Sequence, residues 1–574
     1  MRKFFLVFAV TLWGTLGFAQ QFPLFKVIGF YSETVEQDHI DFAHEAVSFF
    51  ENLTAGGGIL FDSCNSLNNM TYEQLKKYDI VIFFNDSPTN PKARKAFERY
   101  MEEGGAWYGF HYAAYNDKNT QWPWFVNFLG GTVFHNNNWP VMPAKLIVDD
   151  PLHAVCRTLP DSFIAPTNEW YQWEPSPRLN DNVDVLLTLS PEVYPLGYKA
   201  VLREGDIPVV WTNTQYRMIY MNMGHGKGLF ADPTQNTLFI NALTWLSKTD
   251  VNRKELAPTQ EKVVVAYVFY RSEDQPLPDP SAITHINFAF GHVNETFDGV
   301  YVPQPKALHN VANLTEVKPS LKVLLSIGGW GSGRFSEMAS DPVKRASFAR
   351  DCKRVIDEYH LAGVDFDWEY PSTGMANISA APEDTRNFTL LMKEVRQAIG
   401  PEKLLTIATS ASGKYIAFNE ITSSVDFVNI MCYDFVANEP LHHSGLYPSS
   451  LTGEMSCYES VLAHVRAGFP IERLVLGIPF YGKGVEGFPR VREGMSQIEH
   501  LEGYTACWDD IAKGPYLKDK EGKVVFCYDN PRSVGYKCAF IHKYGLKGAM
   551  YWAYGYDDFN ESMRWAVYNG VMDR

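Results

Sequence analysis

Apolar runs and segments with helical spacing alternate along the first half of the chain. A β-rich run spans Lys26 to Tyr31, and a segment of helical character follows from Asp38 to Glu51. The stretch from Asp79 to Phe84 is apolar after its first residue, as in a strand buried on both faces. A helical segment from Pro91 to Glu103 precedes another strand from Ala106 to Tyr112. This alternation predicts an α/β domain whose parallel sheet has helices on both faces, with a ligand crevice at the carboxyl ends of the strands.

The second half contains eight candidate strands separated by helical segments. Eight β/α units in about 310 residues fit a TIM barrel, whose active sites lie at the carboxyl ends of its strands. The expected strands begin near Val263, His285, Lys322, Gly363, Leu404, Phe427, Arg473 and Gly548.

The apolar pattern lapses between Lys248 and Lys262, where charged and polar residues surround one proline. A chain of 574 residues is longer than one core usually supports. We therefore predict two domains, at 22–249 and 262–574, joined by a linker at 250–261.

The first residues have the pattern of a secretory signal peptide. Arg2 and Lys3 precede an apolar run from Phe4 to Leu16, and Gly17-Phe18-Ala19 offers a small-x-small cleavage pattern. We predict a signal peptide at 1–19 and a secreted or periplasmic protein. About 20 apolar residues are needed to span a bilayer, so we expect no transmembrane segment in the mature chain.

Composition narrows the classes of partner. The net charge of −15 would repel a phosphate backbone, so we expect no nucleic-acid partner. Aromatic residues make up 14% of the chain, enough to supply sugar-binding faces as well as core packing. The eight cysteines include no C-x-x-C pair, which argues against a zinc knuckle or a redox motif, and their pairing stays open.

Three carboxylates alternate along the fourth barrel strand. Asp365, Asp367 and Glu369 share one face, because side chains alternate along a strand, and the residues between them are apolar. Three buried like charges cost several kcal/mol unless protons are held or shared. The row therefore predicts a proton store coupled to a general acid, against the alternatives of a solvated edge strand or a metal site.

Five motifs stand in order at the expected strand ends. They are SIGGW at 326–330, GVDFDWEYP at 363–371, MCYD at 431–434, GIPFYG at 477–482 and GAMYW at 548–552. With these motifs, the chain from Lys262 onward resembles glycoside hydrolase family 18, the chitinase family. One such motif would be weak, whereas five in order form a specific pattern.

The resemblance implies a retaining, substrate-assisted reaction without an enzyme nucleophile. Glu369 would protonate the glycosidic oxygen and later act as the base toward water. Asp367 would bind the acetamido N–H of the sugar, and Asp365 would share a proton with Asp367. Tyr433 would donate its hydroxyl to the acetamido oxygen. No cofactor is implied.

The resemblance also implies a sugar-binding cleft. Trp552 would lie under the scissile sugar, and Trp330 would stack on the leaving-group side. Strict alternation puts Asp434 opposite Tyr433, so its place in the cleft follows from the resemblance alone. The further cleft candidates are Tyr267, Phe288, Met431, Asp434 and Tyr481.

Three features depart from the family pattern. Ala362 stands where members often have another Asp, and Lys483 stands where many have Arg. The stretch between Gly484 and Gly548 is short for the large inserted domain that walls a deep cleft in some chitinases. Cleft depth, and with it endo or exo action, stays open.

The first half resembles the trehalose-utilisation (ThuA-like) family, a variant of the class I glutamine amidotransferase fold. The matching pieces lie at 104–111, 129–131, 169–171, 210–212 and 224–226. Amidotransferases carry a nucleophilic Cys in a strained turn after such a strand, whereas His111 holds that place here, which argues against thiolate chemistry. The residues that could gather around a sugar or a metal are His39, His111, His135, Glu169 and His225; their spacing identifies no metal.

The sequence therefore predicts hydrolysis of β-1,4 bonds in chitin or related N-acetylglucosamine-containing glycans. The alternatives are an endo-β-N-acetylglucosaminidase acting on N-glycans and a chitin-binding, lectin-like protein. Retention of Glu369 with both aspartates favours an enzyme over a lectin. We expect the N-terminal domain to bind or process a carbohydrate. A competing hypothesis makes this domain the main catalyst and the barrel its accessory.

Overall fold

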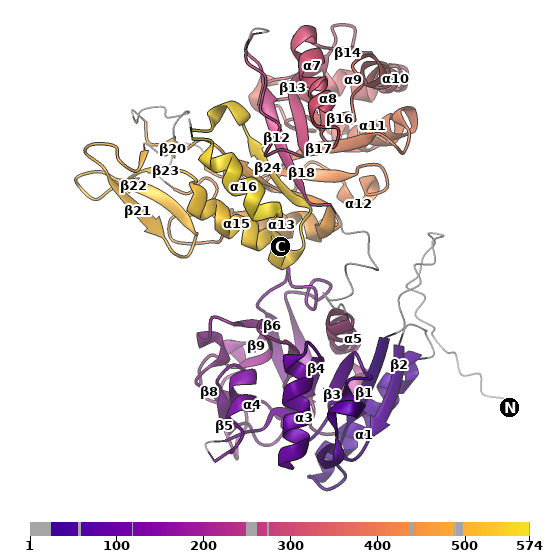
Figure 1. The fold of residues 1–574 in the computed structure, drawn as a ribbon, viewed down its shortest axis with the longest axis vertical. Coiled ribbons are helices and arrows are strands. Elements are labelled where there is room, and N and C mark those ends of the chain that lie inside the picture. The colour runs from indigo at the N-terminus through magenta and orange to yellow at the C-terminus, as the bar shows by residue number, and fades with distance from the viewer. Residues whose placement is uncertain are drawn as a thin grey trace, which may run out of the picture. The chain divides into compact units, whose positions relative to one another are not determined.

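The computed structural model describes residues 25–54, 59–117, 119–247, 261–272, 275–436, 441–486, 488, 498–558 and 560–572. The chain divides into two compact units, Met1–Leu256 and Ala257–Arg574 (Figure 1). The predicted signal peptide and nearly all of the predicted linker lie outside the described residues. Among the helices that are described, none is both long and apolar enough to cross a membrane.

The N-terminal unit is built on a nine-stranded sheet. Its strands lie in the order β2, β1, β3, β4, β11, β10, β9, β6, β7, and the first five are mutually parallel. The remaining contacts are antiparallel. Their bounds are β1 Phe25–Phe30, β2 Ile59–Cys64, β3 Ile80–Phe83, β4 Ala106–Phe110, β6 Met142–Val148, β7 Ser162–Asn168, β9 Val183–Leu189, β10 Pro208–Asn213 and β11 Arg217–Met221.

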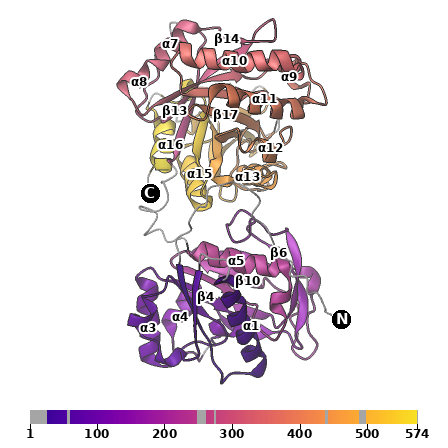
Figure 2. The same ribbon diagram turned by 90° about the vertical axis from the view of Figure 1, so that its right-hand side faces the viewer.

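Helices cover both faces of this sheet (Figures 1 and 2). Alternate residues of β1 enter different cores, because Val27 packs with Phe42 of α1 whereas Ile28 packs with Phe97 of α3. The predicted parallel sheet with helices on both faces is confirmed, and an antiparallel half extends it. The helices are α1 Gln37–Thr54, α2 Tyr72–Leu75, α3 Pro91–Glu102, α4 Pro123–Phe128 and α5 Pro233–Ser247; a separate strand pair joins β5 Val133–Asn137 to β8 Tyr171–Glu174.

The C-terminal unit is a closed barrel of eight parallel strands. Each strand pairs with its neighbour, and β12 contacts both β13 and β24, which closes the ring. The predicted TIM barrel is confirmed, and seven of the eight strands begin at the expected residue. The strands are β12 Val263–Phe269, β13 His285–Val293, β15 Lys322–Gly328, β16 Gly363–Asp367, β17 Leu404–Ser410, β18 Phe427–Met431, β19 Leu474–Pro479 and β24 Gly548–Trp552.

Helices surround the barrel, and local signals fix their ends (Figure 2). Asp341 caps α10, since its carboxylate accepts the amide hydrogen of Val343 at 2.8 Å, and Pro342 follows at the first helical position. A capping box between Asn530 and Ser533 starts α15, and Gly545 ends it in the left-handed conformation. The helices are α7 Pro305–Ala312, α8 Leu314–Val317, α9 Phe335–Ser340, α10 Pro342–Glu358, α11 Asp384–Ile399, α12 Phe418–Ile421, α13 Cys457–Arg466, α15 Pro531–Tyr544 and α16 Ser562–Met572.

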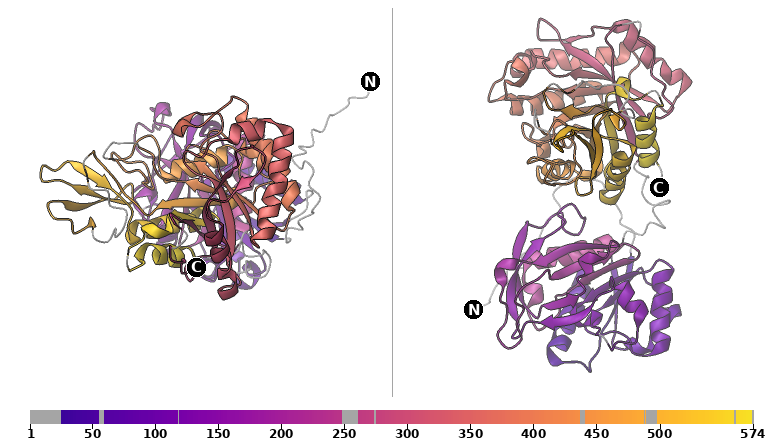
Figure 3. Two further views of the ribbon diagram at one scale, coloured as in Figure 1. Left: turned by 90° about the horizontal axis from the view of Figure 1, so that it is seen from above. Right: turned by 90° about the vertical axis from the view of Figure 1, so that its left-hand side faces the viewer.

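The segment between β19 and β24 forms a small inserted sheet. Its four antiparallel strands lie in the order β20, β23, β22, β21 and project from the barrel (Figure 3). A separate core of Ile498, Leu517, Val525, Phe526 and Tyr528 supports it. The stretch between Gly484 and Gly548, which is short for a large inserted domain, therefore forms a small inserted sheet. The strands are β20 Lys483–Gly484, β21 Thr505–Asp509, β22 Gly514–Lys518 and β23 Val524–Cys527. Outside this sheet, the two-residue strand β14 Val300–Tyr301 pairs antiparallel with the end of β13.

Candidate active site

The carboxylate row of β16 lies inside the barrel. Asp365 is fully buried, and Asp367 and Glu369 are 5% and 9% exposed. Trp368 points the other way and stacks on Phe335 of α9, with ring centroids 5.2 Å apart. The alternation along the strand thus separates the carboxylates from the helix-facing residues.

Asp365 is the innermost carboxylate and accepts hydrogen bonds from four barrel strands. Its donors are the hydroxyls of Tyr267, Ser326 and Thr406, at 2.9, 2.7 and 2.6 Å, and the Asn429 amide at 3.3 Å. Burial raises the pKa of Asp365, whereas these hydrogen bonds lower it. The four donors stabilise the charged form, but burial outweighs them and the pKa stays above its usual value, so Asp365 can hold or share a proton at the bottom of the row.

Asp367 has a different environment although it is only two residues away. Burial, together with the charges of Glu369 and Asp365, raises its pKa well above the usual range. Its Oδ1 atom is buried and has no hydrogen-bond partner. A buried polar atom without a partner is costly, so this oxygen is a candidate contact for a ligand.

Glu369 is the outermost member of the row. Burial raises its pKa to about 7, with a smaller contribution from the charge of Asp434, while a hydrogen bond with Tyr370 opposes the shift. A carboxyl group that keeps its proton near neutral pH can serve as a general acid.

Asp434 reaches the cleft through its backbone conformation. Its φ of +60° is left-handed, so the alternation that would send it away from Tyr433 stops there. Its carboxylate accepts the Tyr481 hydroxyl at 2.7 Å and lies 3.0 Å from Lys483 Nζ. Burial alone would raise its pKa, but the hydrogen bond and charge of His443, with Lys483 and Tyr481, lower it to about 2.

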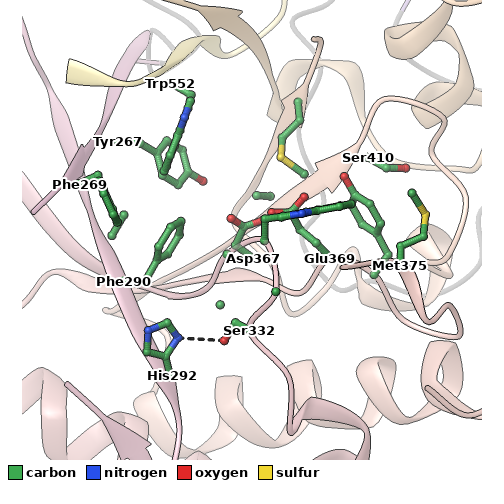
Figure 4. A pocket seen from close by; sticks show the side chains of 18 of the residues that line it. Tyr267, Phe269, Phe290, His292, Ser332, Asp367, Glu369, Met375, Ser410 and Trp552 are labelled. Atoms are coloured by element: carbon green, nitrogen blue, oxygen red, sulfur yellow. Dashed lines mark hydrogen bonds between the residues drawn. The ribbon is translucent and has the colours of Figure 1, made fainter. Parts of the chain in front are cut away.

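A cavity of about 2030 Å³ opens above the row. Trp552 stacks on Phe290 at 5.7 Å on one side of the carboxylates, and Met375 and Ser410 lie on the other side (Figure 4). Trp330 is 63% exposed at its edge. The predicted residues that line the cavity are Tyr267, Phe288, Trp330, Asp367, Glu369, Met431, Tyr433, Asp434, Tyr481 and Trp552; Asp365 lies beneath them.

The sequence reading missed several aromatic lining residues. Phe290 follows Phe288 by two positions on β13, so alternation from a residue already chosen would have found it. Phe269 ends β12, and Tyr370 stacks on Tyr415 at 5.4 Å. Phe269, Tyr370 and Tyr415 lie at a strand end or in loops, where the sequence pattern carries little information on the direction of a side chain.

The comparison with known families decides the identity of the barrel. The model for glycosyl hydrolases family 18 matches residues 263–557, which is 295 of 574 residues and more than half of the chain. The chain belongs to glycosyl hydrolases family 18. The resemblance predicted from its five motifs is confirmed.

Relatives of the family 18 barrel include curated and solved proteins. Chitinase A1 of Niallia circulans is 33% identical over 337 residues, covering 50% of this chain and 48% of that protein. A family 18 N-acetylglucosaminidase structure from Paenibacillus barengoltzii is 33% identical, with a TM-score of 0.49 over 54% of this chain and all of that one. The chain thus spans about half the length of the first of these relatives.

The other half of this family 18 chain has its own match. The trehalose utilisation model covers residues 27–246, as the sequence predicts. A ThuA-like protein of Bacteroides uniformis, known as a crystal structure, is 53% identical over 40% of this chain and 93% of that one, with a TM-score of 0.39.

Four of the five candidate residues of the N-terminal unit meet in one place. His39, His111, Glu169 and His225 each offer a ligand atom, and these atoms lie within 4.8 Å of one another. His135 does not join them, contrary to the expectation. It lies at an irregularity in the pairing of β5 with β8, and its half-exposed ring contacts Glu174 at 2.9 Å.

His111 occupies a strained turn directly after β4. Its φ is +42°, and a Cβ atom on Gly224 would lie 2.4 Å from the His111 Cβ atom, so glycine is required opposite it. Cys156 is buried, and burial raises the pKa of its thiol well above the usual range. The turn after β4 thus presents an imidazole, and the surroundings of Cys156 disfavour a thiolate.

Proposed function

We propose that the barrel hydrolyses β-1,4 glycosidic bonds in chitin or related N-acetylglucosamine-containing glycans by a retaining, substrate-assisted reaction. The observation that carries the proposal is the unpartnered Oδ1 atom of Asp367, buried in the cleft beside a carboxyl with a pKa near 7. An acetamido N–H would give this oxygen its missing donor. A family 18 barrel with both aspartates and Glu369 supports the same reading.

Glu369 performs the first proton transfer. Its carboxyl donates the proton to the glycosidic oxygen as the bond from that oxygen to the anomeric carbon breaks. The carbonyl oxygen of the substrate's own acetamido group attacks the anomeric carbon, which gives an oxazolinium ion. The leaving sugar departs as an alcohol, and Glu369 is left as a carboxylate.

Asp367 and Tyr433 hold the acetamido group for this attack. Asp367 accepts its N–H and, as a charged group, stabilises the positive ring. The Tyr433 hydroxyl faces the thioether of Met550 at 4.0 Å, a weak acceptor, and so can turn to the acetamido oxygen. Asp365 lies below with its four donors and shares the proton that Asp367 releases or takes up.

The second step returns the enzyme to its starting state. Glu369, now a base, removes a proton from water, and the resulting hydroxyl attacks the anomeric carbon from the side that the leaving sugar vacated. The oxazolinium opens to the acetamido group, and the configuration is retained. Trp552 would lie under the sugar ring at the cleavage point, and Trp330 would contact the next sugar.

Replacement of Glu369 by Gln tests the assignment. Glu369→Gln keeps the shape of the side chain and removes the transferable proton, so hydrolysis of chitin oligomers should fall by up to about 10,000-fold while glycan binding persists. Initial rates and equilibrium binding to the same oligomers measure the two effects. A variant that keeps a tenth of the wild-type rate would disprove the role of Glu369.

The substrate is tested with matched sugars. A chitin oligomer deacetylated at the cleavage point lacks the internal nucleophile and should not be cleaved, whereas the acetylated oligomer is. Mass spectrometry of digests of chitin oligomers and of an N-glycoprotein separates chitinase from endo-β-N-acetylglucosaminidase action. Equal turnover of both oligomers contradicts the substrate-assisted reaction.

We also propose that the protein is exported and that its N-terminal unit binds or processes a carbohydrate. The basic and apolar residues at 2–16 support export. Recovery of a mature chain that starts near Gln20 outside the cytoplasm would support it.

A further inference from the structure

The cluster of three histidines and one glutamate in the N-terminal unit has the composition of a transition-metal site. Imidazole nitrogens and a carboxylate oxygen suit Zn²⁺ and related divalent ions. The four residues come from distant parts of the chain: His39 from α1, His111 from the turn after β4, Glu169 from before β8, and His225 from after β11. The fold therefore assembles the set from four separate segments.

His39 is the member that a purely structural role does not explain. Its ring is 3% exposed, and neither Nδ1 nor Nε2 has a hydrogen-bond partner. A neutral imidazole carries its proton on one nitrogen and leaves a lone pair on the other, so His39 can offer a ligand atom to the cluster. A buried imidazole with two unpartnered nitrogens is costly unless a ligand completes it.

His111 is held so that one nitrogen points at Glu169. Its Nδ1 lies 2.8 Å from the backbone carbonyl oxygen of Asn222, which can only accept, so the tautomer with the proton on Nδ1 satisfies this contact. The side-chain amide of Asn222 donates to the Tyr220 hydroxyl at 3.3 Å, and its nitrogen also lies 3.0 Å from His111 Nδ1. In that tautomer the lone pair of Nε2 faces the Glu169 Oε2 atom at 3.2 Å, and a cation bound between these two acceptors would stabilise the contact.

His225 has a carboxylate on each side of its ring. Nδ1 lies 3.0 Å from Glu169 Oε2, and Nε2 lies 3.3 Å from Asp38 Oδ2. A neutral ring can donate to only one of them. Donation to Asp38 would leave Nδ1 free for a metal, which is the carboxylate–histidine–metal arrangement common around metal-bound histidines.

The four donor atoms lie within 4.8 Å of one another, and two of the distances between them are those of a tetrahedral shell. With metal bonds of about 2.0 to 2.1 Å, neighbouring ligand atoms in such a shell lie about 3.3 Å apart. The two contacts of Glu169 Oε2 with histidine nitrogens, 3.2 and 3.0 Å, are close to that value. Glu169 Oε1 is turned away by a hydrogen bond from Asn137, and Asn168 fixes the backbone at Gly224 and His225.

We propose that His39, His111, Glu169 and His225 bind one Zn²⁺ ion, with Asp38 as the outer partner of His225. The charges of Glu169 and Asp38 balance the charge of the ion. The position of His111 in the turn where amidotransferases carry their nucleophile puts this ion at the carboxyl end of the parallel strands, where ligands of such sheets bind. All four proposed ligands lie in the N-terminal unit, whereas the residues proposed for glycan cleavage lie in the C-terminal unit.

Metal analysis of the full chain tests the proposal. Protein stripped with a chelator and dialysed against Zn²⁺ should retain one zinc per chain. His39→Phe keeps an aromatic ring against Tyr112, which stacks on His39 at 4.9 Å, and removes both ring nitrogens. We expect it, and Glu169→Gln, to lose at least about 100-fold in zinc affinity by competition with a chromophoric chelator, since ligand loss should exceed the outer-partner effect.

Three further variants make the result decisive. Asp38→Asn alters a half-exposed side chain, so it should fold, and it should weaken binding by about 10- to 100-fold. His135→Ala removes an exposed histidine outside the cluster and should bind zinc normally. Glu369→Gln should also bind normally, which separates this proposal from the barrel reaction. A full chain that retains no zinc, or equal affinity in wild type, His39→Phe and Asp38→Asn, overturns it.

Discussion

Glu369 and Asp434 are both acidic side chains of one cleft, yet their surroundings move their pKa values in opposite directions. Glu369 is buried with few compensating donors, and its pKa rises to about 7. Asp434 has Lys483, His443 and Tyr481 around it, and its pKa falls to about 2. One residue is thereby kept as an acid and the other as a fixed negative charge at the same pH.

The raised pKa of Glu369 predicts both a rate profile and a stability profile. The acid must be protonated, so kcat/KM should fall about tenfold per pH unit above pH 7. Ionisation in the folded state costs about 3 kcal/mol for a shift from 4.5 to about 7. Wild-type stability relative to Glu369→Gln should therefore decline as pH rises from about 4.5 to 7, as measured by urea unfolding.

Asp434→Asn is the matched control for that profile. Because the pKa of Asp434 is lowered, its carboxylate stabilises the fold above its ordinary pKa of 3.8, and the effect disappears as pH falls toward 2. The difference between wild type and Asp434→Asn should thus shrink toward acid. Parallel profiles for the two variants would contradict the assigned environments.

The barrel strands were predictable because the local sequence of each strand has a pattern typical of a strand. Val263, Lys322 and Gly363 begin strands where apolar runs begin, and the D-x-D-x-E spacing alone puts three carboxylates on one face. The inserted sheet was not predicted, since its strand β20 is only two residues long. The antiparallel half of the first sheet was not predicted either, although β6, β7 and β9 have seven residues each, because tertiary pairing sets the direction of a strand. The exclusion of His135 depends on an irregular pairing that only tertiary structure reveals.

Two barrel strands begin with glycine because the neighbouring strand leaves no room for a side chain. A Cβ atom on Gly548 would lie 1.9 Å from the Val263 carbonyl oxygen, whereas one on Gly535 in α15 would meet nothing within 4 Å. Gly548→Ala should therefore lower the melting temperature of the barrel by several degrees or prevent folding. Gly535→Ala should raise stability by about 0.5 to 1 kcal/mol.

Calorimetry of both alanine variants checks this contrast. The same chemical change has opposite signs at the two positions, so a general effect of replacing glycine is excluded. A Gly548→Ala protein as stable as the wild type would mean that the strands can separate locally at Val263 without loss.

The chain as a whole consists of two units with separate cores. The N-terminal cores include Val27 and Ile28, the barrel interior includes Val265 and Met550, and the inserted sheet has its own cluster. Every residue assigned to glycan cleavage lies in the second unit. Each unit thus has a hydrophobic core of its own, and we expect it to fold by itself.

Residues 262–574 alone should therefore fold and cleave soluble chitin oligomers within a few-fold of the full chain. In the full chain, His111→Ala should leave that rate within a few-fold of wild type while weakening zinc and any carbohydrate binding of the N-terminal unit. Circular dichroism measures the folding of residues 262–574, and initial rates measure the cleavage of chitin oligomers by each protein. A folded but inert barrel that regains activity with the N-terminal unit would show that the two units share one active site.

Asp365 also indicates how such a barrel can change over evolution. Its four donors, from β12, β15, β17 and β18, would lose their common acceptor if the carboxylate disappeared. The outermost position, Glu369, carries no comparable structural duty. A descendant that gave up cleavage to become a binding protein could lose Glu369 at little cost to folding, but it would have to keep Asp365. Among relatives, we therefore expect the position of Asp365 to stay acidic wherever the barrel folds, and the position of Glu369 to stay acidic only where the protein is an active enzyme.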